Sequence, residues 1–400
     1  MRRTCFLGFV ALTIARLASA DTVDEASFLA ALDGAHPALR ALGGELARAD
    51  AARRRAGTLG NPRLEFWRER PAGSPTLTNW TLAWTPPLDG RFGLGKRAAE
   101  AGVAVARETL AIDAAALRRE LRRVFADWSL AHARSRILAD HLERAAALAE
   151  QERQRARVGT ESGLAARRLT LAEAEARAAL RSAEAESARA AAAARAWQPG
   201  LGREAAPVVP ELPPAPPNPT TSAVPSVRRA ERQLEQARLE ARLAGRYWGF
   251  PTLQAGVQRL ESGGLVESGP ILGAAWSIPL FDRNQGARIE GQRQVEIAEA
   301  RSAQAQALAA SQIQGGLDAY RALRLAVGEA LQASAETGRV IAAATAAYRA
   351  GETSLTDLLD ALRSALETRL RELDLRAEAL ATHRDLEAVL GRPLTDGGVR

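Results

Sequence analysis

The side chains that most often do chemistry are few and scattered in this chain. No histidine has a carboxylate or a second histidine at metal-ligand spacing, so each is interpreted as a solvated or helix-flanking residue: His36, His132, His141 and His383. The single cysteine is Cys5, and neither a nucleophile signature nor a phosphate-binding glycine loop is present. The sequence therefore predicts no enzyme, no catalytic residue, no metal site and no cofactor.

Two carboxylates have a spacing that could act on ions. Asp357 and Asp360 are three positions apart, so they lie on one face of a helix. If copies of the chain repeat them around an axis, they form stacked rings of negative charge that favour cations and hinder anions. The same two acids also suit the first turn of a helix, where the helix dipole favours negative charge.

The formal net charge of +7 raises the question of nucleic-acid binding. Lys96 is the only lysine, and the arginines alternate with glutamate and alanine along helical stretches. Such charges form solvated helix faces with pairs four residues apart. The pattern therefore favours no nucleic-acid partner.

The N-terminus predicts export from the cytoplasm. Met1, Arg2 and Arg3 precede a short apolar run, and Ala18-Ser19-Ala20 fits the small-residue cleavage rule, so residues 1–20 are expected to be a signal peptide. Cleavage would remove Cys5 and leave no cysteine for a disulfide or a lipid. No later apolar run approaches the roughly 20 residues that a spanning helix needs.

The most informative feature is an internal repeat. The segment Trp84-Thr85-Pro86-Pro87-Leu88 returns as Trp276-Ser277-Ile278-Pro279-Leu280, which is 192 positions later. Gly159 and Gly351 have the same separation. We expect repeat 1 at 21–197, a proline-rich extended connector at 198–225, repeat 2 at 226–391 and a C-terminal tail at 392–400.

Each repeat shows the same order of expected elements. A first helix, at about 38–58 or 226–247, follows a proline near its start. Two strands come next, at about 62–70 and 76–86 in repeat 1 and at about 251–261 and 268–279 in repeat 2. A long helical hairpin follows, at about 95–197 or 284–391, with apolar residues spaced as in a coiled coil.

The expected strands alternate apolar residues with small or polar ones. That alternation fits a membrane-barrel strand and also an ordinary hairpin of a soluble sheet. Aromatic residues at strand ends favour the membrane interpretation, because they are enriched at the bilayer interface. The expected membrane-interface aromatics are Trp67, Trp80, Trp84, Trp248 and Trp276.

These elements predict an α+β fold that is mainly α. Four strands alone leave two unpaired edges, which are costly in lipid, so several copies must combine into one closed transmembrane β-barrel. The same copies would set their helical hairpins side by side as a long coiled-coil α-helical barrel. A barrel continued by a helical tube is a conduit.

The strand exits WTPPLDGR and WSIPLFDRNQG, together with the turns RVGTES and RAGETSLTDLLDA, resemble the TolC-type outer-membrane efflux family over essentially the whole mature chain. The resemblance implies a homotrimer in outer-membrane lipid that extends into the periplasm. It also implies a periplasmic membrane-fusion adaptor and an inner-membrane resistance-nodulation-division pump as partners. The run from Ser277 to Gly286 resembles the heavy-metal branch, which serves cobalt–zinc–cadmium or copper–silver pumps.

The resemblance also assigns roles to particular residues. Tyr348, Asp357 and Asp360 match the positions that narrow the tunnel mouth, although Thr353 stands where a basic gate partner is expected. The helical turns become the periplasmic tips that contact the adaptor, formed by Arg157, Gly159, Ser162, Gly351, Ser354 and Leu355. Glycine permits the left-handed backbone that a helix end needs, and serine can cap the returning helix, so tight turns without a partner fit as well.

The resulting function is a passive duct of a tripartite efflux pump for heavy-metal cations. Two alternatives remain within transport, namely a duct for drugs and a duct for type I protein secretion. A third, from another class, is a soluble periplasmic coiled-coil scaffold.

Overall fold

The computed structural model describes residues 22–30, 37–70, 72–158, 163–216, 220–246, 250–278 and 280–394. The expected signal peptide at 1–20 lies outside this range. The chain forms two compact units: unit 1 comprises Met1–Asp33, Glu120–Pro213 and Tyr320–Thr382, and unit 2 comprises Gly34–Arg119, Pro214–Ala319 and His383–Arg400. Each unit takes segments from both expected repeats, so the compact units do not coincide with the repeats.

The order helix, strand, strand, helix, helix occurs twice along the chain. The first set is α2 (Pro37–Ala56), β2 (Arg63–Glu69), β3 (Thr76–Trp84), α3 (Arg91–Arg157) and α4 (Gly163–Trp197). The second set is α5 (Pro225–Gly245), β5 (Thr252–Ser262), β6 (Leu265–Ala275), α6 (Gln285–Ala350) and α7 (Leu355–Leu390). Pro37 and Pro225 each occupy the first position of a helix, where the missing N–H costs nothing.

Each sheet-to-helix exit is held by a local aspartate. The Asp89 carboxylate accepts hydrogen bonds from the Arg91 backbone N–H at 3.0 Å and from its Nε at 2.7 Å, after Gly90 with φ +79°. In the second exit the Asp282 carboxylate accepts the N–H of Asn284, whose φ is +59°. The first turn starts α3 at Arg91, four residues before the expected start at Gly95, and the second starts α6 at Gln285.

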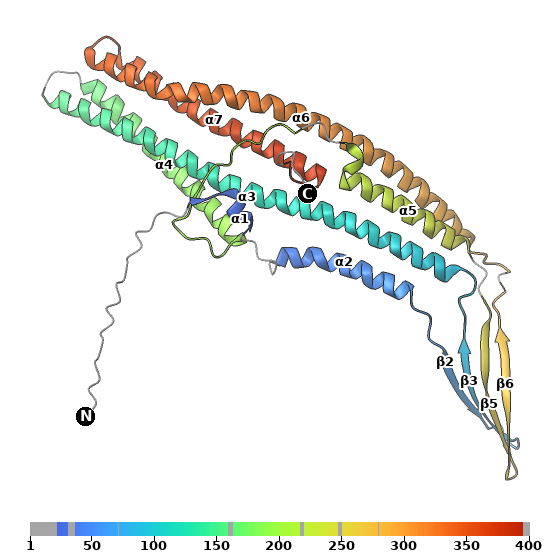
Figure 1. The fold of residues 1–400 in the computed structure, drawn as a ribbon. Helices are drawn as coiled ribbons and strands as arrows, with labels where there is room; N and C mark the ends of the chain where they lie inside the picture. The colour runs from blue at the N-terminus through green and yellow to red at the C-terminus, as the bar shows by residue number, and fades with distance from the viewer. Residues whose placement is uncertain are drawn as a thin grey trace, which may run out of the picture. The chain divides into compact units, whose positions relative to one another are not determined.

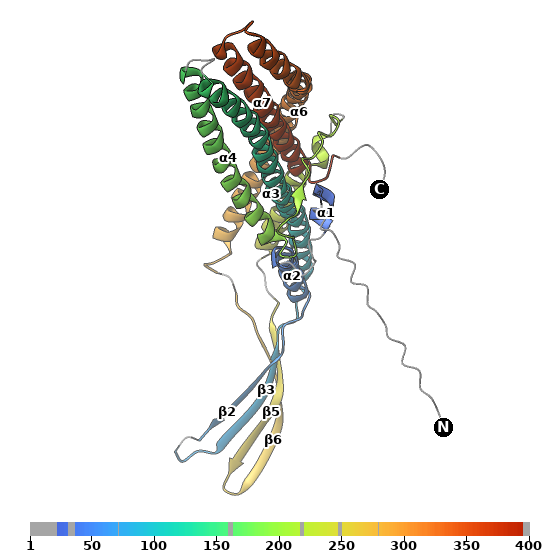
Figure 2. The same ribbon diagram turned by 90° about the vertical axis from the view of Figure 1, so that its left-hand side faces the viewer.

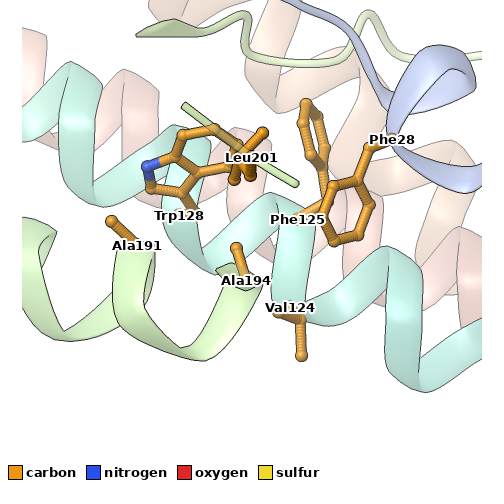
Figure 3. Close-up of a cluster of buried hydrophobic side chains, with 7 residues drawn as sticks. All are labelled: Phe28, Val124, Phe125, Trp128, Ala191, Ala194 and Leu201. Atoms are coloured by element: carbon orange, nitrogen blue, oxygen red, sulfur yellow. The ribbon is translucent and has the colours of Figure 1, made fainter. Parts of the chain in front are cut away.

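The chain before α2 contributes to the core of unit 1. β1 (Thr22–Val23) pairs in parallel with β4 (Ala206–Pro207) of the connector, and α1 (Glu25–Ala30) follows. Figure 3 shows Phe28 of α1 facing Phe125, with Leu201 beside Trp128. The Phe28 and Phe125 ring centroids are 5.4 Å apart. The connector therefore supplies a short strand and the core residue Leu201, and it contains a 3-10 helix at Thr221–Ala223.

Unit 1 is otherwise a helical bundle. A second cluster of buried side chains joins α3, α4 and α7 through Leu148, Ala149, Leu169, Leu358 and Leu362. Ion pairs also join α3 to α7, including Arg134 with Asp374 and, at 3.3 Å, Arg369 with Asp140. In Figures 1 and 2, α3 and α4 run side by side within this unit.

The helices of unit 2 pack through small residues and arginine pairs. An added Cβ at Gly291 of α6 would lie 3.0 Å from the Ala241 Cα of α5, so these two helices approach closely. Arg228 of α5 pairs with Glu108 of α3 at 2.9 Å. His383, near the end of α7, is only 1% exposed, so the interpretation of it as a solvated residue is wrong. Its Nδ1 lies 3.9 Å from the carboxylate of Glu387, four residues later, so the interpretation that it has no carboxylate nearby at such a spacing is wrong as well.

The sheet of unit 2 has four antiparallel strands in the order β2-β3-β5-β6. The strands lie side by side in both views (Figures 1 and 2). Gly263 and Gly264, both with positive φ, form the two-residue turn between β5 and β6, so β6 begins at Leu265 rather than at about 268. Among the described residues, no helix is long and apolar enough to cross a membrane.

Candidate functional site

The sheet has one continuous apolar face that is exposed. The register places Phe66, Trp80 and Val257 next to one another on three adjacent strands. These side chains are 53%, 50% and 53% exposed, and the Phe66 and Trp80 ring centroids lie 4.5 Å apart. The remaining large apolar members of this face are Leu64, Leu82, Trp84, Leu253, Val266 and Leu272. So large an exposed apolar surface indicates contact with lipid or with another apolar surface.

The opposite face is mostly polar or small, with large apolar side chains at Trp67, Leu77, Leu260, Leu265 and Ile271. It presents Glu65, Asn79, Thr81, Gln254 and Gln258, with glycines at positions 256, 269 and 273. The two faces therefore have the alternation of a strand with lipid on one side and water on the other. The hairpins of the two repeats share both faces, because β3 pairs with β5 over nine residues.

A close approach between β3 and β5 depends on Gly256. An added Cβ at this position would lie 2.8 Å from the Thr81 Cα and nearer still to the Trp80 carbonyl oxygen. Beside it, Asn79 is 5% exposed, and its side-chain oxygen has no hydrogen-bond partner in the structure. Sequence alternation alone could not single out Gly256, because the crowding comes from a strand more than 170 residues earlier.

The outer edges of β2 and β6 have no strand partner among the described residues. Each edge therefore presents backbone N–H and C=O groups that can pair with another strand. A sheet with two such edges and an exposed apolar face is incomplete by itself in lipid.

The expected interface aromatics divide between the two faces. Trp80 and Trp84 lie on the apolar face, and the Trp84 Nε1 donates to the Gly60 carbonyl at 3.1 Å. Trp276 follows the end of β6 and is 52% exposed. Trp67 pairs with Asn79 and therefore lies on the polar face, whereas Trp248 falls outside the described residues.

The turn between α6 and α7 satisfies its own backbone. The Gly351 N–H donates to the Tyr348 carbonyl at 3.1 Å, and the Glu352 N–H donates to the Ala347 carbonyl at 2.9 Å. Gly351 has φ +77°, so this pair of bonds is a Schellman motif. The glycine was predicted to end the helix, and the structure shows how.

The next helix begins with a reciprocal cap. The Ser354 Oγ accepts the Asp357 backbone N–H at 3.2 Å, while the Asp357 carboxylate accepts the Ser354 N–H at 3.0 Å and its Oγ–H at 2.7 Å. Hydrogen bonds from the Ser354 side chain and backbone lower the pKa of Asp357. The carboxylate therefore stays ionised at neutral pH and is exposed at the start of α7.

The other residues assigned to this end of the hairpin are placed as follows. Asp360 is exposed one turn later and lies 3.6 Å from Arg363. Tyr348 and Leu355 are partly buried against the cluster that contains Leu358. Tyr348 therefore lies near the end of α6 and Asp357 near the start of α7, with the tyrosine partly buried and the carboxylate in solvent.

The turn of the first hairpin is only partly described. Arg157 is exposed at the end of α3, whereas Gly159 and Ser162 lie outside the described residues. At the positions equivalent to Asp357 and Asp360, α4 has Ala165 and Arg168. The two helical hairpins therefore differ in charge at these positions: the second has two acidic residues, and the first has an alanine and an arginine.

The described residues contain no group of three or more histidine, cysteine, aspartate or glutamate side chains that could hold a metal ion. His132 and His141 lie partly buried on α3, and burial lowers the pKa of each, with a smaller contribution from Arg136 and Arg144 respectively. Both are therefore neutral at pH 7.

Residues 221–392 match the family model named Outer membrane efflux protein. No curated protein matches the chain. Several solved structures do match: CusC aligns with a TM-score of 0.77 at 17% identity, covering 92% of each chain. VceC of Vibrio cholerae aligns with a TM-score of 0.75 at 16% identity, over 92% of this chain and 96% of that one. CmeC of Campylobacter jejuni aligns with a TM-score of 0.75 at 13% identity, over 91% and 84%.

At these identities the structural likenesses establish the fold, which is that of outer-membrane channel proteins. The family match covers the second repeat with its strands and helical hairpin. This match spans less than half of the chain, so the likeness to that family rests on residues 221–392. CusC, VceC and CmeC match with nearly equal scores, so the fold selects no branch of that family.

Proposed function

We propose that this protein is the outer-membrane channel of a tripartite efflux pump. Three copies place their four-stranded sheets edge to edge as a closed barrel, and the helical hairpins continue it as a duct through the periplasm. The observation that carries the proposal is the sheet, with an exposed apolar face, a polar opposite face and two unpaired edges. Export through such a duct is passive, and the energy comes from the inner-membrane pump.

The oligomeric state of the protein in membranes tests this proposal. Membrane fractions run without heating on a mild-detergent gel are expected to show a trimer. A soluble coiled-coil scaffold would instead appear as a monomer in the salt-washed supernatant, and that result would exclude the channel.

For cargo, we propose heavy-metal cations, with drugs and secreted proteins as the alternatives. The support is the strand exit around Phe281 and Asp282, which resembles the metal branch, and the exposed acids at the start of α7. Deletion of the gene is expected to raise sensitivity to divalent metals. Sensitivity to drugs alone would assign the duct to a drug pump.

We further propose that Tyr348, Asp357 and Asp360 narrow the periplasmic mouth. Three copies would give rings of carboxylates, and the hydrogen bonds of the cap lower the pKa of the Asp357 members. Replacing both acids by alanine is expected to raise conductance in planar bilayers and to weaken block by trivalent cations. Unchanged conductance together with unchanged block would contradict the proposal that these residues form a gate.

The same turn is proposed to contact the periplasmic adaptor. Gly351 has a positive φ and open space around an added Cβ, so a bulky residue there would strain the turn and protrude from it. Gly351→Trp is expected to abolish efflux while the trimer still assembles. Gly338, a helical glycine of α6 with open space, serves as the matched position for Gly338→Trp.

A further inference from the structure

One line of side chains crosses all four strands at the border of the apolar face. The register pairs Arg68 with Thr78, Thr78 with Arg259, and Arg259 with Ser268. We call these four residues the donor row. Two positions further from the hairpin turns, the same face carries Phe66, Trp80, Val257 and Pro270. Only Thr76, Glu261 and Val266 of this face lie between the donor row and the hairpin turns, so the row is near the end of the face that is closest to the turns.

The donor row carries an excess of positive charge. Glu261 is the carboxylate within reach, 3.0 Å from the Arg259 Nε and 3.6 Å from an Arg68 terminal nitrogen. One carboxylate cannot neutralise two guanidinium groups, and both arginine side chains remain more than half exposed, at 55% and 54%. Each guanidinium has five N–H donors in a planar fork, so donors remain for a further anion.

The place of the donor row on the sheet indicates which anion it binds. We propose that the donor row binds the phosphate groups of lipid headgroups at the outer surface of the membrane. The inference rests on the proposed function, which puts the apolar face in lipid and the hairpin turns outward. Arginine binds phosphate in a bidentate manner, and the hydroxyl groups of Thr78 and Ser268 add donors between and beside the two arginines.

The adjoining apolar residues distinguish a lipid from free phosphate. A lipid whose phosphate lies on the donor row would extend its acyl chains along Phe66, Trp80 and Val257, which are exposed. Free phosphate has no group to occupy that surface. We therefore expect the affinity for a phosphorylated lipid to exceed that for inorganic phosphate by a large factor.

The test uses the full-length trimer in detergent with diphosphoryl lipid A as the probe, and native mass spectrometry reports how much lipid stays bound. A basic side chain near a charged membrane surface adds roughly fivefold to binding. Arg68→Gln and Arg259→Gln are each expected to weaken retention by about that factor, and the double variant by roughly 25-fold, if the two act independently. Glu261→Gln is expected to increase the retention of lipid, because this variant removes the negative charge that pairs with both arginines.

A matched control exists on the same strand as Arg68. Arg63 is 80% exposed at the opposite end and on the opposite face of β2, so Arg63→Gln is expected to change nothing. Equal retention by the double variant and the wild type would overturn the inference, as would equal binding of the dephosphorylated lipid. Full displacement by millimolar inorganic phosphate would show an anion site without lipid selectivity and would also overturn it. A trimer that assembles in membranes but fails these comparisons refutes only the donor row, whereas the absence of a trimer refutes the proposed function.

Discussion

The four-stranded sheet and the turn between α6 and α7 differ in whether their polar backbone groups have hydrogen-bond partners. The turn satisfies its helix ends internally, through the Schellman motif at Gly351 and the cap between Ser354 and Asp357. The sheet leaves two edges without partners and exposes its large apolar side chains. The comparison teaches that the turn is complete within one chain, whereas the sheet has edges and an apolar face that we propose are covered by other copies and by lipid.

The largest expected effect comes from placing a charge on the apolar face. Val257 is 53% exposed near the centre of β5, and its neighbour Gln258 lies on the polar face. Val257→Arg is expected to cost about 2–4 kcal/mol of membrane stability, because arginine at the bilayer midplane must be desolvated. The measurement is the fraction of trimer in the membrane. Gln258→Arg is the matched control, and equal losses in both variants would show that the two faces do not differ as described.

The next largest loss of stability is expected where the two β-hairpins pair, between β3 and β5. Gly256→Ala is expected to cost about 1–3 kcal/mol, because the new Cβ meets the backbone of β3 rather than a flexible side chain. Denaturant unfolding of the trimer would measure the loss. Gly269→Ala, on the same face of β6 and with open space around the added Cβ, is expected to have little effect. A stable Gly256→Ala protein would mean that the strands can separate at no cost.

A smaller effect is expected at the turn. Ser354→Ala removes a helix cap and is expected to cost about 1 kcal/mol locally. Hydrogen exchange of the amides at the start of α7 would report the loss, while the trimer itself should remain intact. Loss of the trimer in this variant would show that the turn depends on assembly after all.

The smallest effect is a dependence on pH. The folded-state pKa of Asp357 is lowered below its ordinary value of 3.8, so its contribution to stability is complete above that value and is lost as the pH falls through the lowered pKa. Exchange at the start of α7, corrected for intrinsic rates, is expected to rise only in strong acid. Ser354→Ala should abolish the difference, and a transition near neutral pH would contradict this origin.

Much of this arrangement could be predicted from local sequence. Pro37 and Pro225 indicate helix starts because their geometry is fixed, and Gly351 indicates a helix end because it tolerates positive φ. The alternation of Leu64 and Phe66 with polar neighbours predicted the two faces. The same alternation places Trp67 on the polar face, so its assignment to the membrane interface ignored a signal that was present.

Other features could not be read from the sequence because they depend on distant segments. The buried position of His383 depends on how the end of α7 packs, and the crowding at Gly256 depends on the register with β3. Phe28 enters the core of unit 1 only because the connector and α3 meet it there. The cap between Ser354 and Asp357 was half predicted: the serine was expected to cap, but its reciprocal partner was not identified.

The central claim is that the outer edge of β2 meets the outer edge of β6 of another copy. Because the predicted mature chain has no cysteine, one cysteine can be placed on each edge strand, at Glu65 and at Gly273, and joined by a short bifunctional maleimide in isolated membranes. The double variant is predicted to give a ladder that ends at three chains, and each single variant should stay monomeric, because the edges meet head to tail. A double variant that stays monomeric, or a ladder that continues beyond three, would contradict the closed trimer.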